Sequence, residues 1–218
     1  MTDDAIYLEY WNKLYNTENF FGTGSTKLAI FAESFLNKLS KAKILEVGCG
    51  QGRDSIYFSQ LGHDVDAFDI SENAIKFLFK VKKELELKNL NVFVHNSLEP
   101  LDYPEKYFDF VYSNLALQFF NLIELSKIFD NISKVMKNNS MFLFSTKKIG
   151  DKYYRKGEKI TDFTFSYNGI TRYFYSIEEL KEIFTKRFDV ISIESDRHEN
   201  LDSTVSVWWK ILLSKKSN

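Results

Sequence analysis

The sequence predicts an α/β fold, a doubly wound sheet of mostly parallel strands with helices on both faces. Short apolar, β-branched runs alternate with longer segments whose apolar residues recur at helical spacing. Such alternation is typical of parallel strands joined by crossover helices. Near residue 200 two strand-like runs follow each other with no helix between them. We therefore expect the last strand to run antiparallel to the rest.

The expected elements follow in order from the first apolar helical segment. Ser25–Leu39 carries apolar residues on one helical face, and Ser25 is a suitable N-cap. The other helices are expected at Gly52–Leu61, Ser71–Leu87, Leu122–Met136 and Ser176–Thr185. The strands are expected at Lys43–Val47, Asp64–Asp69, Leu90–His95, Tyr107–Ser113, Ser140–Thr146, Phe188–Glu194 and Thr204–Leu213.

Two segments stand outside this alternation. The first lies within an N-terminal helical segment, residues 1–40, and its aromatic and apolar residues at helical spacing are Tyr7, Tyr10, Trp11, Leu14 and Tyr15. It is either a helix docked on the core or a lid over a ligand. The second, residues 147–171, fits neither period and mixes Lys and Arg with aromatic residues. We interpret it either as a solvated loop or as a cover over a substrate.

Length and charge limit the possible partners. With 218 residues the chain can bury one full core, so we expect a single domain over residues 1–218, as a monomer or a homodimer. Its 29 Lys and Arg are balanced by 30 Asp and Glu. Nucleic acids and anionic membranes are therefore not expected as partners, because they bind clustered positive charge. The first residues are polar, and we expect a cytoplasmic protein.

The cysteine and histidine content argues against a metal centre. Cys49 is the only cysteine, and His63, His95 and His198 share no ligand spacing. An internal disulfide is therefore excluded, and no metal is expected. Cys49 stands inside a glycine turn, where we interpret it as a small side chain tolerated by the turn rather than as a nucleophile.

A glycine-rich turn follows the first expected strand. It reads Glu46-Val-Gly-Cys-Gly-Gln-Gly52, and its alternate glycines let the backbone turn sharply and a ligand lie against it. A dinucleotide-binding turn would need glycine at position 53, where Arg53 stands. Glu46 would repel a pyrophosphate, but it would attract a ligand that carries an ammonium and a sulfonium.

A second acidic residue ends the next expected strand. Asp69 stands where a carboxylate accepts hydrogen bonds from both hydroxyls of a ribose. Since the carboxyl ends of neighbouring parallel strands meet at one edge of a sheet, Asp69 and the glycine turn are expected to form one site.

A resemblance to a known family rests on Ile44–Ser71, which reads ILEVGCGQGRDSIYFSQLGHDVDAFDIS. This segment resembles the first two motifs of class I S-adenosylmethionine-dependent methyltransferases, in the form shared by the tellurite-resistance and thiopurine methyltransferase branches. A fainter resemblance covers residues 43–141. It implies a Rossmann-like sheet of seven strands, S-adenosylmethionine as cofactor, and transfer of its methyl group to a small-molecule acceptor.

The resemblance also implies roles for cofactor-binding residues. Glu46, Gly48 and Gly50 would hold the methionine amine and face the nucleoside. Asp69 would bind the ribose, and Ile70 would pack on the adenine.

Three further positions complete the expected cofactor site. Ser97 stands where relatives usually carry an acidic residue for the adenine amino group. The backbone N–H of Leu98 is expected to reach adenine N1. Ser113 would line the methionine side, with Asn114 and Gln118 turned toward the acceptor.

Other candidate site residues have two interpretations each. Arg172 and Tyr173 match a position where tellurite-resistance relatives carry an arginine and an aromatic residue near the substrate. His95 is either an acid–base group or a structural histidine. Arg53 either forms a salt bridge on its helix or contacts the cofactor carboxylate.

The N-terminal aromatic residues have a role only if their segment is a lid. The faces of Tyr10, Trp11 and Tyr15 would then stabilise the sulfonium by cation–π attraction.

The acceptor does not follow from the catalytic residues, because the reactivity of a methyl sulfonium belongs to the cofactor. Two alternatives stay open, a protein or RNA methyltransferase and a catalytically silent S-adenosylmethionine-binding regulator. Against the first, the loop after the fourth strand reads Ser113-Asn114-Leu115-Ala116, not the Asn-Pro-Pro-aromatic run used for amino groups of bases.

Overall fold

The main sheet has seven strands, as predicted. A computed structural model describes residues 3–217, so residues 1, 2 and 218 of the expected domain lie outside the described residues. The strands are β1 (Lys43–Val47), β2 (Asp64–Asp69), β3 (Leu90–Val94), β4 (Phe108–Asn114), β5 (Met136–Lys147), β9 (Phe188–Glu199) and β10 (Val205–Lys215). Their order is β3-β2-β1-β4-β5-β10-β9, and β10 runs antiparallel to both neighbours. The predicted fold class, with its antiparallel last strand, is confirmed.

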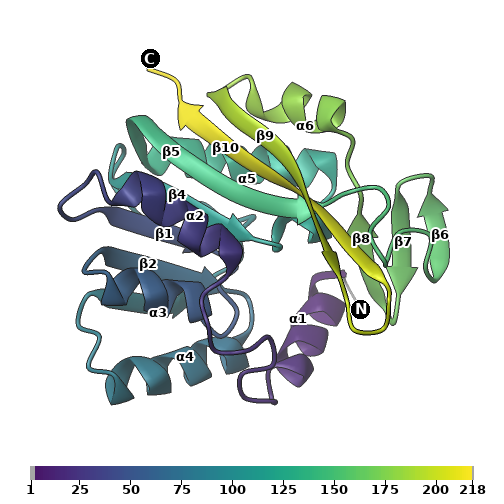
Figure 1. Ribbon diagram of the computed structural model, residues 1–218, viewed down its shortest axis with the longest axis horizontal. Coiled ribbons are helices and arrows are strands. Elements are labelled where there is room, and N and C mark those ends of the chain that lie inside the picture. The colour runs from purple at the N-terminus through teal and green to yellow at the C-terminus, as the bar shows by residue number, and fades with distance from the viewer. Residues whose placement is uncertain (1–2, 218) are drawn as a thin grey trace.

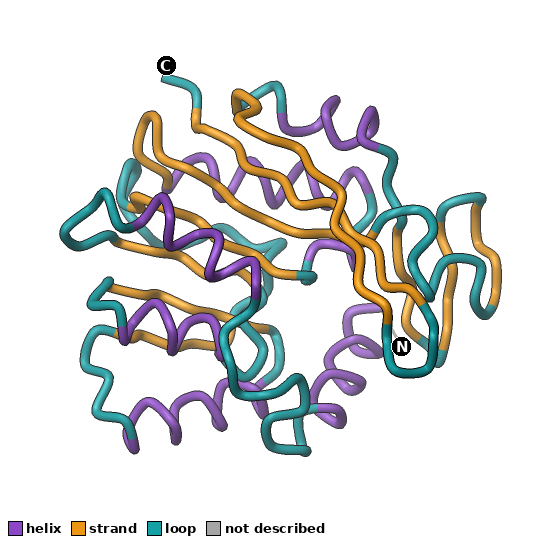
Figure 2. Tube along the Cα trace, in the orientation of Figure 1, coloured by secondary structure: helices purple, strands orange, loops and turns teal. Residues whose placement is uncertain are grey.

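Helices cover both faces of this sheet (Figures 1 and 2). One face carries α2 (Lys27–Leu36), α3 (Arg53–Gln60) and α4 (Glu72–Glu84), and the other carries α5 (Leu122–Val135) and α6 (Ile177–Phe184). The crossovers through α3 and α4 step outward in one direction from β1, and the crossover through α5 steps in the other. Right-handed connections therefore place these helices on opposite faces. The carboxyl ends of β1 and β4 meet where the strand order reverses.

Side-chain caps set the helix starts. Ser71 caps α4, at the first residue of the helix expected over Ser71–Leu87. The expected cap of α2 is wrong by one residue, because Thr26 rather than Ser25 accepts the amide of Ala29. Asp54 of α3 holds Thr26 in place by accepting both its amide and its hydroxyl.

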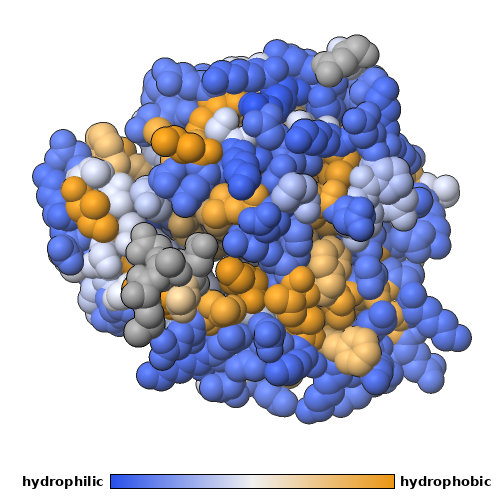
Figure 3. All heavy atoms as spheres, turned by 180° about the vertical axis from the view of Figure 1, so that it is seen from behind, coloured by the Kyte–Doolittle hydropathy of each residue, from blue (hydrophilic) through white to orange (hydrophobic). Residues whose placement is uncertain are grey.

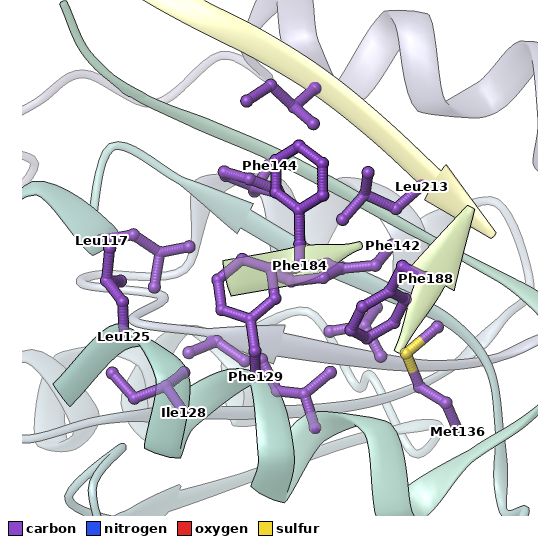
Figure 4. Close-up of a cluster of buried hydrophobic side chains, with 14 of the residues drawn as sticks. Leu117, Leu125, Ile128, Phe129, Met136, Phe142, Phe144, Phe184, Phe188 and Leu213 are labelled. Atoms are coloured by element: carbon purple, nitrogen blue, oxygen red, sulfur yellow. The ribbon is translucent and has the colours of Figure 1, made fainter. Parts of the chain in front are cut away.

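An aromatic cluster joins α5 and α6 to the sheet (Figure 4). The ring centroid of Phe129 lies 5.3 Å from that of Phe142 and 5.4 Å from that of Phe144, both on β5. It lies 5.9 Å from the Phe188 ring of β9 and 6.4 Å from the Phe184 ring of α6. All five rings are buried, and burial of each stabilises the fold by about 1.5–3 kcal/mol.

Residues 147–171 lead into a second, small sheet rather than a solvated loop, so the loop interpretation is wrong. β6 (Glu158–Thr161), β7 (Thr164–Tyr167) and β8 (Ile170–Tyr173) pair antiparallel in sequence order. Each strand has only four residues, which is too short for a clear period. The Asn168-Gly169 turn is the signal that marks this hairpin, and both of its residues have positive φ.

The N-terminal helix α1 (Asp3–Leu14) lies between the small sheet and α4 (Figure 1). The Tyr7 hydroxyl donates to the Thr171 carbonyl of β8 at 2.9 Å. At the other end of α1, the Asn12 carbonyl oxygen Oδ1 accepts from the Ser71 hydroxyl at 2.8 Å. The predicted helix is confirmed, and it connects the small sheet to the helical layer.

The surface is mainly hydrophilic. Figure 3 shows hydrophobic side chains gathered in patches on the face opposite to that of Figure 1. Ile123, at the start of α5, is 84% exposed. No helix among residues 3–217 combines the length and apolar character needed to cross a lipid bilayer.

We expect Phe129→Ala to lower the free energy of unfolding by about 3–5 kcal/mol, because it removes a buried ring and leaves a cavity. The control is Ile123→Ala on the same helix, whose exposed side chain should contribute less than about 0.5 kcal/mol. Urea denaturation followed by circular dichroism measures both. Equal losses in the two variants would contradict the role given to the aromatic cluster.

Candidate functional site

A cavity of about 590 Å³ opens where the strand order of the main sheet reverses. Every predicted site residue except His95 and Ser113 lines it. The predicted residues along its wall are Tyr10, Trp11, Tyr15, Glu46, Gly48, Cys49, Gly50, Arg53, Asp69, Ile70, Ser97, Leu98, Gln118, Arg172 and Tyr173. Open α/β sheets bind their ligands at this place, so the cavity is the candidate site.

The glycine turn at this cavity is fixed to the end of β2. The Cys49 amide donates to the Phe68 carbonyl at 2.9 Å. The Gly50 amide donates to the Asp69 carboxylate at 2.8 Å, and the Ser71 amide donates to the other oxygen of that carboxylate at 2.9 Å. The Asp69 side chain therefore positions the turn as well as lining the cavity.

Two glycines of the turn leave no room for a side chain. A Cβ at Gly48 would lie 2.4 Å from the Cβ of Ala116, in the loop after β4. A Cβ at Gly50 would lie 2.6 Å from the Tyr15 hydroxyl. Both glycines have positive φ, which other residues rarely adopt. The N-terminal segment and the loop after β4 thus approach the turn from two sides.

Buried carboxylates make one end of the cavity acidic. Glu46 is 3% exposed and accepts a hydrogen bond from the Ser55 hydroxyl. Burial raises the pKa of Glu46 well above its usual range, nearby Asp54 raises it further, and the Ser55 hydrogen bond opposes the shift. Burial also raises the pKa of Asp69, against the backbone hydrogen bonds that it accepts. A bound cation would be stabilised at this end.

Cys49 in the turn and Arg53 at the start of α3 had two interpretations each, as a reactive or as a structural residue. Burial, together with the charges of Asp69 and Glu46, raises the pKa of the Cys49 thiol. The thiol therefore stays protonated at neutral pH, which supports its interpretation as a small structural residue. Arg53 donates to the Phe21 carbonyl, at the cavity wall, rather than to a carboxylate.

The loop after β3, where contacts to the adenine are expected, forms one hydrogen bond within the protein itself. The Leu98 amide donates to the Asn96 side chain at 3.0 Å, so this N–H is not free to reach a ligand as expected. Asn96 also lines the cavity, beside Ser97 and Ile70. The sequence reasoning missed Asn96, because it treated only position 97 as a polar contact.

The structure does not bring His95 or Ser113 to the cavity. The His95 ring packs 5.0 Å from the Phe68 ring, and its Nε2 lies 3.3 Å from the Glu99 carbonyl oxygen. Ser113 is fully buried and donates to the Val47 carbonyl at 2.9 Å. Since side chains alternate along β4, it is the next residue, Asn114, that lines the cavity.

The opposite end of the cavity is basic. Arg172 of β8 is 9% exposed, and its guanidinium lies 4.6 Å from the centre of the Tyr153 ring. Lys147, at the end of β5, pairs with buried Asp151 at 2.7 Å. Burial lowers the pKa of Lys147, whereas Asp151 opposes that shift. Lys152 also lines this end. The two lysines and Tyr153 belong to the segment expected as a loop or a substrate cover, but no motif in the sequence gave them individual roles.

Gln118 lies in the 3-10 turn η1 (Leu117–Phe119) after β4, where it lines the cavity. Its Nε2 donates to the Leu115 carbonyl. Its Oε1 is buried and accepts no hydrogen bond from the described residues. A buried carbonyl without a donor costs about 1–3 kcal/mol, so a ligand donor at this atom would be stabilising.

The arrangement can hold a cation at one end and an anion at the other. Such a cavity can align two oppositely charged molecules and exclude water between them. No group of three His, Cys, Asp or Glu side chains is placed to bind a metal ion within the described part of the chain.

The fold is that of the class I methyltransferases. The structure of Burkholderia thailandensis 1,6-didemethyltoxoflavin-N1-methyltransferase with bound 1,6-didemethyltoxoflavin and S-adenosylhomocysteine is similar, with a TM-score of 0.77 at 16% identity over 98% of this chain and 88% of that one. The family model described as "Tellurite resistance protein TehB" matches residues 9–185. This chain belongs to the TehB family.

Two curated relatives are named as methyltransferases. The probable S-adenosyl-L-methionine-dependent methyltransferase TehB of Haemophilus influenzae is 34% identical over 127 residues, which is 58% of this chain and 40% of that protein. The malonyl-[acyl-carrier protein] O-methyltransferase of Buchnera aphidicola is 31% identical over 153 residues, 68% of this chain and 54% of that protein. The chain thus spans 40% of the length of the Haemophilus relative.

We expect Gly48→Ala to destabilise the protein by about 2–4 kcal/mol. The new Cβ would collide with that of Ala116, and an alanine at this positive φ would also be strained. Gly48→Ala combined with Ala116→Gly should recover the collision part and leave the strain. Urea denaturation of the single and double variants measures the difference. No recovery in the double variant would contradict the close approach of the two loops.

The raised pKa of Glu46 predicts a pH dependence of stability. The folded chain keeps the Glu46 proton to higher pH than the unfolded chain, so raising the pH from the usual glutamate pKa of about 4.3 to the raised value lowers the free energy of unfolding. Glu46→Gln should show a smaller decrease, because Asp69 alone then keeps a raised pKa, and exposed Glu158→Gln should keep the full decrease. Denaturation curves between about pH 4 and 8 test this, and identical profiles for Glu46→Gln and the unsubstituted protein would contradict it.

Proposed function

We propose that this chain is an S-adenosylmethionine-dependent methyltransferase that acts on a small-molecule acceptor. The acidic end of the cavity is the observation that carries the proposal, because buried Glu46 and Asp69 flank the glycine turn at the reversal of strand order. S-adenosylmethionine carries an ammonium and a sulfonium, which carboxylates attract, and a ribose, whose hydroxyls a carboxylate accepts. The curated TehB relatives, named as probable S-adenosyl-L-methionine-dependent methyltransferases, support the same cofactor.

The proposed cofactor contacts follow the lining residues. Glu46 would hold the methionine ammonium, and the backbone of Gly48 to Gly50 would face the nucleoside. Asp69 would accept the ribose hydroxyls, and Ile70 would pack on the adenine. A bound ammonium would lower the raised pKa of Glu46, so cofactor binding and Glu46 ionisation would strengthen each other.

The N-terminal aromatic residues support a lid over this end. The Trp11 ring lies 5.9 Å from the Tyr15 ring in a stacked arrangement and 5.1 Å from the Tyr10 ring edge to face. All three line the cavity, and the ring faces suit a neighbouring sulfonium. Burial raises the pKa of Tyr15 well above its usual range, so its phenol stays protonated and its hydroxyl can donate. We therefore propose α1 and Tyr15 as the cover of the cofactor.

The chain's part in the reaction would be alignment. The cofactor supplies an electrophilic methyl group, and Gln118, Arg172 and Tyr173 would orient the acceptor toward it. Burial raises the pKa of Tyr7, on the same side, to about 12, which makes it a hydrogen-bond donor rather than a base at neutral pH. The small sheet that carries Arg172 would exclude water from the acceptor.

A small molecule fits the cavity better than a nucleic acid or a protein. The cationic residues Arg172 and Lys147 are buried within the cavity and do not form an exposed face, whereas phosphate backbones need surface Lys and Arg. α1 and the small sheet also meet across the cavity through the Tyr7–Thr171 hydrogen bond. An S-adenosylmethionine-binding regulator without activity would share the cofactor end, and an acceptor screen separates the two functions.

Calorimetric titration with S-adenosylhomocysteine tests the cofactor site. Asp69→Asn should weaken binding by about 1.5–3 kcal/mol, the effect of losing charge-assisted hydrogen bonds. Asp64→Asn, at the other end of β2, makes the same change outside the cavity and should leave the affinity unchanged. Unchanged affinity in a folded Asp69→Asn would overturn the ribose assignment. Absence of binding to the unsubstituted protein would overturn the proposed function.

A further inference from the structure

We propose that the acceptor is an organic anion with a hydroxyl or amino group near its charged group. Arg172 would bind the anionic group, and Gln118 would accept the hydrogen bond of the hydroxyl or amine. The inference rests on the proposed methyl transfer and names the substrate class of the same site.

The first observation is a buried guanidinium without a carboxylate. Arg172 is 9% exposed, and its Nη1 donates to the carbonyls of Ile170 at 3.2 Å and Tyr167 at 3.5 Å. The ion pairs found among residues 3–217 do not include it. A buried charge is costly unless it is paired, and a guanidinium has five N–H donors with the geometry for a carboxylate or phosphate. An anion bound at the cavity wall would therefore pair with Arg172 and stabilise it.

The charges around Arg172 also favour a negatively charged ligand. Lys147 is neutralised by Asp151, which is itself held by the Val207 amide at 2.9 Å. Glu124 also lines the cavity, but its carboxylate caps α5 by accepting the Asn121 amide at 2.8 Å. Lys152 adds a second cation to the wall, with its ammonium 5.5 Å from the centre of the Tyr153 ring. The positive field of this end would attract and orient an anion.

The second observation is the unpaired oxygen of Gln118. This side chain is 4% exposed, and its amide nitrogen donates to the Leu115 carbonyl, whereas its carbonyl oxygen meets no donor among the described residues. An oxygen of this kind accepts an O–H or N–H and rejects another acceptor atom. A bare anion without a donor would leave it unsatisfied.

Both features line the cavity, and Phe119 links them. The guanidinium of Arg172 is 5.7 Å from the centre of the Phe119 ring, and Phe119 directly follows Gln118. Ala116, in the same loop, contacts the glycine turn at Gly48. Along the chain, Gln118 therefore lies between Ala116 at the glycine turn and Phe119 at Arg172. An acceptor bound to both would direct its charge away from Glu46 and Asp69 and its hydroxyl or amine toward the cofactor.

Sulfate tests the anion site directly, because it is a dianion without a hydrogen-bond donor at neutral pH. Calorimetric titration of the S-adenosylhomocysteine complex with sulfate should show binding that Arg172→Gln weakens about tenfold to a hundredfold. Arg155→Gln, which removes the same charge from an exposed position outside the cavity, should leave the affinity unchanged. Sulfate binding that is absent or indifferent to Arg172→Gln would overturn the anion site.

Transfer of labelled methyl groups tests the organic acceptor. A small-molecule cell extract, separated at neutral pH into fractions retained and not retained by an anion exchanger, is incubated with the enzyme and methyl-labelled S-adenosylmethionine. Label should enter organic molecules of the retained fraction, and Gln118→Met should lower the rate at least about tenfold while S-adenosylhomocysteine affinity is kept.

The other outcomes separate this inference from the proposed function. Label only in the unretained fraction, or only in the methylated product of an inorganic anion, would overturn the organic anion. No label in any fraction, with S-adenosylhomocysteine still bound, would overturn the acceptor class and leave cofactor binding intact. Failure to bind S-adenosylhomocysteine would instead contradict the proposed function itself.

Discussion

The attachment of the glycine turn to the end of β2 is the constraint on which the cavity depends. The amides of Cys49 and Gly50 donate to Phe68 and Asp69, and this pairing fixes where β1 ends and α3 begins. It also brings buried carboxylates together, which is unfavourable in a ligand-free chain. Hydroxyl groups offset part of this cost, because the Asp54 carboxylate accepts from the Thr26 hydroxyl at 2.8 Å and from the hydroxyl of buried Tyr112. The fold thus keeps an electrostatic strain that a cation relieves.

The loop after β4 separates the acidic and basic ends. Leu115 begins it with φ of 53°, an uncommon conformation for leucine, and its amide donates to the Ser145 hydroxyl at 3.0 Å. The Ser145 hydroxyl in turn donates to the Asn114 side chain at 2.6 Å. These contacts hold Ala116 over the glycine turn and Gln118 toward β8. A short irregular segment therefore sets the relation between the two halves of the cavity.

The sequence was sufficient for the parts of the site that follow from local pattern. The bounds of β1 and β2, and with them Glu46 and Asp69, agree with the apolar runs and the glycine turn. Which of two residues at a strand end faces the cavity was less predictable. β4 continues to Asn114, and the Ser113 hydroxyl donates to the Val47 carbonyl of the neighbouring strand instead. Lys147 ends β5, and Lys152 and Tyr153 precede the small sheet, in a segment for which the sequence indicated only a loop or a substrate cover. Their place depends on contacts between distant segments, which periodicity does not report.

The Tyr7–Thr171 hydrogen bond joins residues that are far apart along the chain. The roof of the cavity, made of α1 and β6–β8, forms only when both of these segments have docked. Long-range contacts of this kind form late in folding, after the entropy of closing a long loop has been lost. The roof can also separate without disturbing the seven strands, since α1 and β6–β8 lie outside the main sheet. Ligand exchange then follows local opening rather than global unfolding, and amide hydrogens of the roof should exchange faster than those of the central strands.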